Sequence, residues 1–562
     1  MLSTNKILLV LSLFLYFTSC KNKSTKIEQT LSTLDLKRGE LLLCGDPNFG
    51  EVSFALSCRY ELRDTFNLGL SLIHSFEYAE AEKAFVRVLD QDPECLMAYW
   101  GTAMSILNHP LTFKQNPAAL ARGEALLKIA HKLTANNARE QDYIDAVSIY
   151  FKDWQTLDTQ TRKKNYEYKM ATLYAKYPND LETAIFYSLS VLASSDLNDK
   201  TYRQQKKSGK ILEDLFISNP NHPGIAHYII HNYDAPELAN LALTTARKYA
   251  TIAPASSHAQ HMPSHIFTRL GLWNESINSN IDSANAAICY AESVNPDATW
   301  VNEIHAMDYL VYAYLQVGDN ENAQAVLDKI HTIKTVFPVN SLAAAYALIA
   351  VPARIAIENK NWKLASQLKI PETQMNWNEA HWSKAMLHFS RALGFSNTNN
   401  PKAAEKELDI LITLRNGLIK NKDSYAEGQV TIQINATKAW IEFAKGNSEK
   451  AITFMQLAVA LESKTSKAPV TPGELVPASE LLGNLYLASN QPEKALETYK
   501  LNLELHPLRF NGIYGAAKAA IELNKTTEAI YYFDQLVRLS TAVKSNRPEV
   551  AEAKAFLKNP QT

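Results

Sequence analysis

The sequence predicts an all-α protein, a solenoid of stacked antiparallel helix pairs. Glycine is scarce, at 18 of 562 residues, which leaves little turn chemistry for a many-stranded β protein. A hydrophobic content of 46%, with 57 basic and 58 acidic side chains, excludes a disordered chain. Small and aromatic residues also recur with a period of about 34 residues. The near-neutral charge provides no basic surface, so we expect no nucleic-acid partner.

The first 19 residues are typical of an export signal. Lys6 precedes an unbroken apolar run, Ile7–Phe17, which is too short for a membrane-spanning helix of about 20 residues. Thr18, Ser19 and Cys20 follow, and this ending resembles a bacterial lipobox. The resemblance implies that Cys20 is lipidated and begins the mature chain. The alternatives are a plain secretory signal peptide cleaved nearby or a short buried helix.

Residues 20–60 are predicted to be a tether followed by a disulfide loop. Residues 21–26 are polar and carry no acid next to Cys20, so we expect anchoring in the outer membrane, on its periplasmic side. Disulfides persist in exported proteins, and Cys44 and Cys58 flank a stretch that contains glycine and proline. A bridge between Cys44 and Cys58 is the predicted pairing. Cys95 and Cys289 would then be small buried hydrophobes.

Helix pairs with the same internal spacing occur at both ends of the remaining chain. The first predicted pair, residues 66–93, has small, aromatic and proline positions at Gly69, Ala81, Phe85 and Pro93. The same intervals return at Gly483, Ala495, Tyr499 and Pro507, and again at Ala517, Ala529 and Phe533. Small residues let two helices approach closely, the aromatic ring fills the gap to the next pair, and proline ends the second helix. Glu80 and Glu82 are expected on a solvent-exposed helix face.

This pattern resembles the tetratricopeptide repeat superfamily over most of residues 66–557. The resemblance implies a tetratricopeptide-like α-α superhelix, whose extended concave surface suits a protein or peptide partner. We expect an N-terminal array at residues 61–338 and a C-terminal array at residues 339–562. Loops are predicted at residues 115–117, 338–340, 397–401 and 464–477.

Histidines gather in one region of the chain. They are His227, His231, His258, His261, His265 and His305. His227 and His231 are spaced i, i+4 and share one helix face, and His258 falls on the same stripe as the pair His261 and His265. The two i, i+4 pairs differ by 34 residues. They are therefore predicted to lie on the first helices of consecutive repeats, in the concave groove, with the last histidine on the next first helix.

Imidazoles in register on adjacent helices predict a site for a divalent transition metal. Neutral imidazole suits zinc, copper or iron, and helical zinc sites use i, i+4 histidine pairs. The six histidines and Asp308 are the candidate ligands, while Asp234 and Glu303 would orient them. Two alternatives stay open. One is a buried structural network of polar side chains, and the other is a groove in which His and Tyr bind an anion or a peptide terminus.

Two motifs restrict the resemblance to one group of proteins within the superfamily. HYIIHNYD, at residues 227–234, and HMPSHIF, at residues 261–267, resemble sequences in a group of bacterial tetratricopeptide proteins, many of them exported. That resemblance implies a fold and an exported location, and it names no reaction. His74, Trp100 and His109 belong to its N-terminal motifs and would join the site. The alternative is that Trp100 belongs to the hydrophobic core and His109 to a turn.

Common catalytic motifs are missing from the sequence. It contains no phosphate-binding loop, dinucleotide fingerprint, nucleophile elbow or HExxH zinc motif. We therefore predict a periplasm-facing tetratricopeptide lipoprotein that acts as a binding or scaffold protein, with a His-rich site in its central groove. The alternative is a metal-binding protein or a metal-dependent oxidoreductase or hydrolase built on the histidines.

Overall fold

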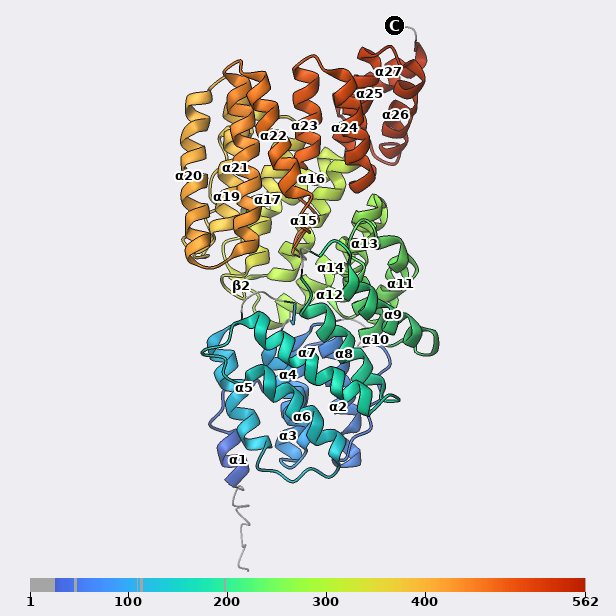
Figure 1. The fold of residues 1–562 in the computed structure, drawn as a ribbon. Coiled ribbons are helices and arrows are strands. Elements are labelled where there is room, and N and C mark those ends of the chain that lie inside the picture. Colours follow the sequence, from blue (N-terminus) through green and yellow to red (C-terminus); the bar gives the residue numbers. More distant parts are fainter. Residues whose placement is uncertain are drawn as a thin grey trace, which may run out of the picture.

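The chain is almost entirely helical, and the predicted superhelix of helix pairs is confirmed. The structure, a computed structural model, describes residues 26–44, 48–108, 110–111, 115–196, 199–468 and 470–560. Successive helices pack against one another along the molecule, from the N-terminal helices at one end to the C-terminal helices at the other (Figure 1). Among the described residues, no helix combines the length and the apolar character needed to cross a membrane.

The N-terminal third of the chain forms the lower half of the molecule in Figure 1. Its elements are α1 (Lys26–Leu31), η1 (Tyr60–Leu62), α2 (Arg63–His74), α3 (Tyr78–Gln91), α4 (Leu96–Leu107), α5 (Pro117–Ala130), α6 (Ala138–Phe151), α7 (Thr159–Lys176), α8 (Leu181–Ala193) and α9 (Arg203–Ser218). Their buried apolar side chains form one core that continues to the start of the central section.

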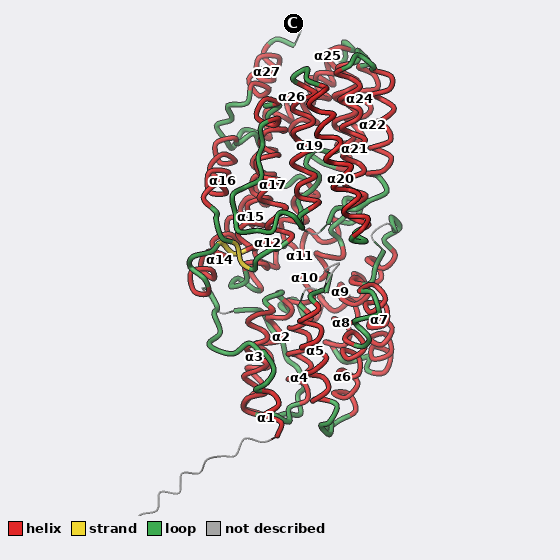
Figure 2. The backbone as a smooth tube through the Cα atoms, turned by 90° about the vertical axis from the view of Figure 1, so that its left-hand side faces the viewer, coloured by secondary structure: helices red, strands yellow, loops and turns green. Residues whose placement is uncertain are grey.

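The central section holds the predicted histidine motifs. Its elements are α10 (Pro223–Asn232), α11 (Ala239–Ile252), α12 (Ser257–His261), α13 (Pro263–Leu270), α14 (Trp273–Val294), β1 (Thr299–Trp300), α15 (Val301–Gln316), α16 (Asn320–Thr332) and β2 (Val336–Phe337). The two short strands pair in parallel, Thr299 opposite Val336 and Trp300 opposite Phe337, beside α14 (Figure 2).

The C-terminal section is a regular row of long helices. They are α17 (Leu342–Glu358), α18 (Trp362–Ser366), α19 (His381–Asn397), α20 (Pro401–Lys420), α21 (Ser424–Ala444), α22 (Ser448–Glu462), α23 (Ala478–Ala488), α24 (Pro492–Leu505), α25 (Phe510–Glu522), α26 (Thr526–Leu539) and α27 (Pro548–Lys558). Two predicted loops, residues 338–340 and 464–477, lie between elements, after β2 and between α22 and α23. The other two overlap helix ends: residues 115–117 run into the first residue of α5, and residues 397–401 include the last residue of α19 and the first of α20.

The repeat spacing has a direct steric cause, which is the same at both ends of the chain. The Phe85 ring lies between Gly69 and Gly101, where an added Cβ would come within 2.9 and 2.4 Å of it. Tyr499 lies in the same way between Gly483 and Gly515, with corresponding distances of 2.7 and 2.3 Å. In these two places, the aromatic ring of the second helix therefore occupies space that only glycine leaves open on the two first helices beside it.

The described part of the predicted tether packs on the N-terminal array. The backbone N–H groups of Lys37 and Leu42 donate to the carboxylates of Glu82 and Glu80, at 2.9 and 2.8 Å. Both glutamates are 2% exposed. The expectation that they lie on a solvent-exposed face is therefore wrong, because an extended segment covers that face and the carboxylates satisfy its donors.

The predicted bridge between Cys44 and Cys58 is also wrong. Cys44 is bonded to Cys289 of α14, and Cys58 is bonded to Cys95 at the start of α4. The segment between Cys44 and Cys58 does not close on itself, because Phe49, Phe54 and Leu56 along it are buried in the core. Its two ends consequently reach different helices.

Candidate metal centre

The structure brings the six predicted histidines together in two neighbouring clusters. His227 and His231 on α10 join His258 on α12, and His261 and His265, at the end of α12 and on α13, join His305 on α15. Within each cluster, ligand nitrogens of the three rings lie within 4.8 Å of one another. Each cluster thus combines an i, i+4 pair on the first helix of one repeat with a single histidine on the first helix of the next repeat.

Pro263 does not disturb the spacing of the second pair. It occupies the first position of α13, where its missing N–H costs nothing, and Met262 before it keeps helical angles of φ −53° and ψ −38°. The stripe therefore continues from α12 into α13. As a result, the Nε2 atoms of His261 and His265 approach to 3.0 Å.

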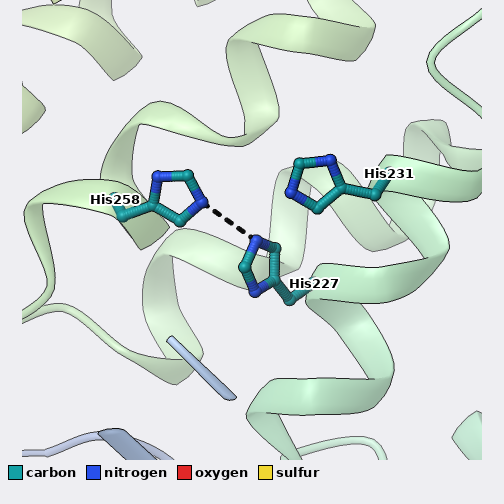
Figure 3. Close-up of side chains that lie close together, drawn as sticks. All are labelled: His227, His231 and His258. Atoms are coloured by element: carbon teal, nitrogen blue, oxygen red, sulfur yellow. Dashed lines mark hydrogen bonds between the residues drawn. The ribbon is translucent and has the colours of Figure 1, made fainter. Parts of the chain in front are cut away.

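The first cluster consists of His227, His231 and His258, whose rings are gathered together in Figure 3. His227 Nδ1 lies 2.6 Å from the backbone carbonyl of His74, so this nitrogen carries the proton. The opposite nitrogen, Nε2, lies 3.1 Å from Nε2 of His258. Phe76 packs on all three rings, with centroid distances of 4.3, 5.6 and 5.2 Å.

In the second cluster, the partners of His261 and His265 fix the tautomers of both rings. His261 Nδ1 lies 2.6 Å from Asn280 Oδ1, and the amide orientation is set because Asn280 Nδ2 donates to the carbonyl of Ser276 at 2.7 Å. His265 Nδ1 lies 2.8 Å from the carboxylate of Asp234. Both Nδ1 atoms therefore face acceptors and carry the proton, which leaves a lone pair on each Nε2.

The two Nε2 lone pairs consequently lie 3.0 Å apart, with no proton between them. Tyr309 cannot supply that proton to His265, because its hydroxyl donates to the carbonyl of Thr471 at 3.0 Å. Burial lowers the pKa of His261 well below its usual value and also lowers that of His265, so neither ring gains a proton readily. A cation bonded to both nitrogens removes this repulsion.

Asp234 is the electrostatic anchor of the second cluster. Besides His265, its carboxylate accepts from Arg269 Nε at 2.9 Å and from Lys467 Nζ at 2.7 Å. Despite burial, these cations hold the pKa of Asp234 well below its usual value, so the group is ionised. Burial in turn lowers the pKa of Lys467 to about 8. An ionised Asp234 is the partner that keeps the proton of His265 on Nδ1.

Both clusters border one cavity of about 730 Å³. His231 and His258 of the first cluster and His265 and His305 of the second line its wall. Aromatic side chains contribute much of the remaining surface, including those of Phe76, Tyr78, Tyr290, Trp300 and Phe337. A small molecule in this cavity would meet ring edges from both clusters.

Asp308 is not placed where a ligand is needed, and this corrects the prediction that it belongs to the metal set. Its carboxylate is fully buried against Arg354, whose Nε donates to it at 2.9 Å. Because α17 supplies that guanidinium, the side chain serves the interface between α15 and α17. Glu303 is also engaged elsewhere, 3.4 Å from Lys329, and does not orient a histidine ring.

Of the N-terminal candidates that the structure describes, His74 touches the site through its backbone carbonyl. Its ring belongs to a separate buried group in which Glu182 accepts from His74 and His222, both at 2.9 Å. Trp100 is 1% exposed and packs edge-on against Phe186 in the core. His109, Cys20 and the predicted signal peptide lie outside the described residues.

A remote loop completes the site. The segment between α22 and α23 passes beside α15 in Figure 1. Thr471 accepts the Tyr309 hydroxyl, and the carbonyls of Gly473 and Glu474 accept from Arg354 at 2.9 and 2.6 Å. The sequence indicated only a loop here, because nothing local shows that it returns more than a hundred residues to the central groove. Phe76 was missed for the same reason, and Asn280 was missed because no local pattern shows that it meets His261.

Comparison with known proteins supports the repeat assignment. The tetratricopeptide repeat family matches residues 480–543, which include α24 and α25. No curated protein matches the chain in sequence.

Solved structures with a similar outline include yeast Tom70, at 11% identity over 89% of this chain and 95% of that one, with a TM-score of 0.33. A tetratricopeptide repeat protein from Parabacteroides merdae has 12% identity over 54% of this chain and 99% of its own, with a TM-score of 0.27. The human IFIT1 dimer with PPP-AAAA has 12% identity over 92% of this chain and 100% of that one, with a TM-score of 0.36. Likeness of this degree carries no information about a ligand. The chain therefore contains tetratricopeptide repeat sequence at residues 480–543, within an array of packed helix pairs.

Proposed function

We propose that the protein is a metal-binding lipoprotein of the bacterial cell envelope, in which the second cluster, His261, His265 and His305, holds a transition-metal ion. The observation that carries this proposal is the 3.0 Å approach of two Nε2 lone pairs whose protons are committed elsewhere. A buried polar arrangement that is repulsive when empty needs a cation to complete it. Zinc, copper and iron all accept such imidazole donors.

The surroundings of the second cluster support a metal rather than a purely structural network. In protein metal sites, the non-ligating nitrogen of a histidine commonly donates to a carboxylate or carbonyl. His265 with Asp234 and His261 with Asn280 reproduce that arrangement. The separate group around Glu182 gives the contrast, since a carboxylate there accepts from both His74 and His222 and ordinary hydrogen bonds explain it.

Metal content tests the proposal. The folded, exported protein would be incubated separately with Zn²⁺, Cu²⁺ and Fe²⁺, freed of unbound ion, and analysed by mass spectrometry of the elements. We expect stoichiometric metal in the wild type and a loss from the His261→Gln/His265→Gln variant. His131→Gln is the matched control, because His131 is exposed on the far end of α5. Wild-type protein without stoichiometric metal after all three incubations would overturn the proposal and favour the structural network.

The envelope location is part of the same proposal. Its support is the apolar run that precedes Thr18, Ser19 and Cys20, together with two disulfides, Cys44–Cys289 and Cys58–Cys95, of the kind that persists in oxidising compartments. We expect cells that express the wild type to incorporate labelled palmitate into the protein and to retain it in the outer-membrane fraction. Cys20→Ser should abolish both. Labelling that survives Cys20→Ser would contradict the lipid anchor.

Partner recognition is the second role that we propose, and the tetratricopeptide fold supports it. Such arrays present extended surfaces to protein partners. In this chain the loop between α22 and α23 contacts Tyr309 of α15 and Arg354 of α17. We expect a partner to bind on another part of the array. Cross-linking in cells tests this role, and cross-links that fall only within the chain would contradict it.

A further inference from the structure

The first cluster repeats the construction of the second. Each has an i, i+4 pair on one first helix, and the pairs His227/His231 and His261/His265 stand one 34-residue repeat apart. Each is completed by a single histidine from the following first helix, and in each the three ligand nitrogens lie within 4.8 Å. The same backbone geometry therefore offers the same three-nitrogen donor set twice.

The two clusters are also neighbours. The centroids of His231 and His265 lie 6.0 Å apart, and those of His258 and His261 lie 6.3 Å apart. Within the clusters, the corresponding distances run from 4.3 to 6.2 Å. The closest rings of different clusters are thus only slightly farther apart than rings of one cluster. The six imidazoles form one continuous array.

Both clusters face the same space. Two histidines of each line the 730 Å³ cavity, so ions held by the two clusters would be reached from one side by one small molecule. Structural zinc sites normally close four protein ligands around the metal, whereas catalytic sites keep three and leave a position open. Three histidines on each side of a shared cavity match the open kind.

Phe76 covers the first cluster. It has a φ of +59°, the left-handed conformation that also follows the first helix of other pairs, at Lys360 and Asn490. In each of these turns the next residue donates its N–H to a carbonyl five residues back, so the conformation belongs to the repeat turn. The Phe76 ring lies against all three imidazoles, close to parallel with those of His231 and His258.

We propose that the two clusters together bind two copper ions, as a two-metal centre with six imidazole ligands whose open positions face the shared cavity. The proposal rests on the proposed function, because it adds a second ion beside the one at His261, His265 and His305. The donor set selects copper: it contains no thiolate and no carboxylate, and Cu²⁺ binds nitrogen sites most tightly among the divalent first-row metals.

Copper loading of the full exported chain, followed by electron paramagnetic resonance, tests the two-metal centre. We expect two copper ions for each wild-type chain, displacement of Zn²⁺ by Cu²⁺, and magnetic interaction between the ions. That interaction would appear as a half-field signal or as a loss of integrated intensity. These three measurements need only wild-type protein, so they do not depend on whether a variant folds.

Variants then show which cluster holds each copper ion. His227→Gln/His231→Gln should retain one copper with an ordinary mononuclear spectrum, and His131→Gln should keep both ions. One ion in the wild type that persists in His227→Gln/His231→Gln would leave the proposed function standing and overturn the two-metal centre. Two ions with full, uncoupled intensity would overturn it as well. Zinc that copper fails to displace would overturn the choice of metal, and absence of any bound metal would overturn the proposed function itself.

Discussion

Lys467 and Asp234 are separated by 233 residues in the sequence, and their side chains form an ion pair of 2.7 Å beside the histidine clusters. The ammonium group is 1% exposed. Because Asp234 also accepts from His265, the pair connects the loop between α22 and α23 to a candidate metal ligand. The C-terminal half of the chain therefore takes part in building a site whose ligands all come from the middle.

Removing the cation should destabilise the fold. We expect Lys467→Met to lower the free energy of unfolding by about 3 kcal/mol, because it leaves part of a buried carboxylate charge uncompensated. Denaturant unfolding followed by circular dichroism measures the change. Lys464→Met is the matched control, since Lys464 lies on the same loop but is exposed and should change stability by less than about 0.5 kcal/mol. Equal effects of the two substitutions would show that the buried pair adds nothing.

Asn280 should matter for metal affinity although it cannot reach the metal. Its Oδ1 fixes the proton of His261 on Nδ1, so Asn280→Leu should weaken metal binding by about 10–100-fold. Competition with a chromophoric chelator measures the dissociation constant. Asn280→Asp keeps an acceptor at the same place and should rescue most of the affinity. Failure of the rescue, with the protein still folded, would show that Asn280 acts through packing alone.

The two disulfides should differ in how much they stabilise the protein. Cys44–Cys289 closes a loop with a sequence separation of 245, against 37 for Cys58–Cys95. Chain-entropy arguments assign the longer loop the larger stabilisation, with about 2–4 kcal/mol as the usual size for one bridge. Cys44→Ser/Cys289→Ser should therefore lower the Tm more than Cys58→Ser/Cys95→Ser does.

Peptide mapping without reduction provides the check on these pairings. It should recover linked peptides that contain Cys44 with Cys289, and Cys58 with Cys95. A peptide that joins Cys44 to Cys58 would contradict the path of the N-terminal segment.

Much of the fold could be predicted because its causes are local. Helix periodicity and proline positions locate the helix pairs, and the 34-residue period places equivalent residues on equivalent helices. The same register brings the six histidines together, since the positions of side chains on neighbouring helices follow from the repeat.

Contacts between distant segments could not be predicted in this way. Asp308 stands one turn from His305, yet it faces α17 because Arg354 is there to receive it. Lys467 reaches Asp234 only through a loop whose path no local pattern sets. The cysteine pairing likewise depends on where the segment before Cys58 is buried. In each case the deciding partner lies far away in the sequence.

Half-buried His506 should make stability depend on pH. Burial, with Arg509 and Arg269 nearby, lowers its pKa to about 4, although Glu474 opposes the shift. Because the unfolded chain keeps a value near 6.5, it binds more protons between these two pH values. The His506 contribution is thus complete above pH 6.5 and is lost as the pH falls toward 4. Between pH 7 and pH 4.5, we expect the free energy of unfolding of His506→Gln to fall by about 2 kcal/mol less than that of the wild type. Urea unfolding at the two pH values measures the difference. An unchanged pH profile would contradict the assignment.

Two glycines on first helices should respond oppositely to the same substitution. A Cβ at Gly515 of α25 would lie 2.3 Å from the Tyr499 ring, so Gly515→Ala should destabilise the protein by about 1–3 kcal/mol through overpacking. Gly428 of α21 has open space around its Cβ position, so Gly428→Ala should stabilise by about 0.5–1 kcal/mol through helix propensity alone. Denaturant midpoints measured under one condition compare them directly. If both substitutions stabilised the protein, close approach of glycine to the aromatic ring could not be the reason for the small–aromatic–small spacing. Opposite signs would show that steric room at the repeat interface sets the sequence period.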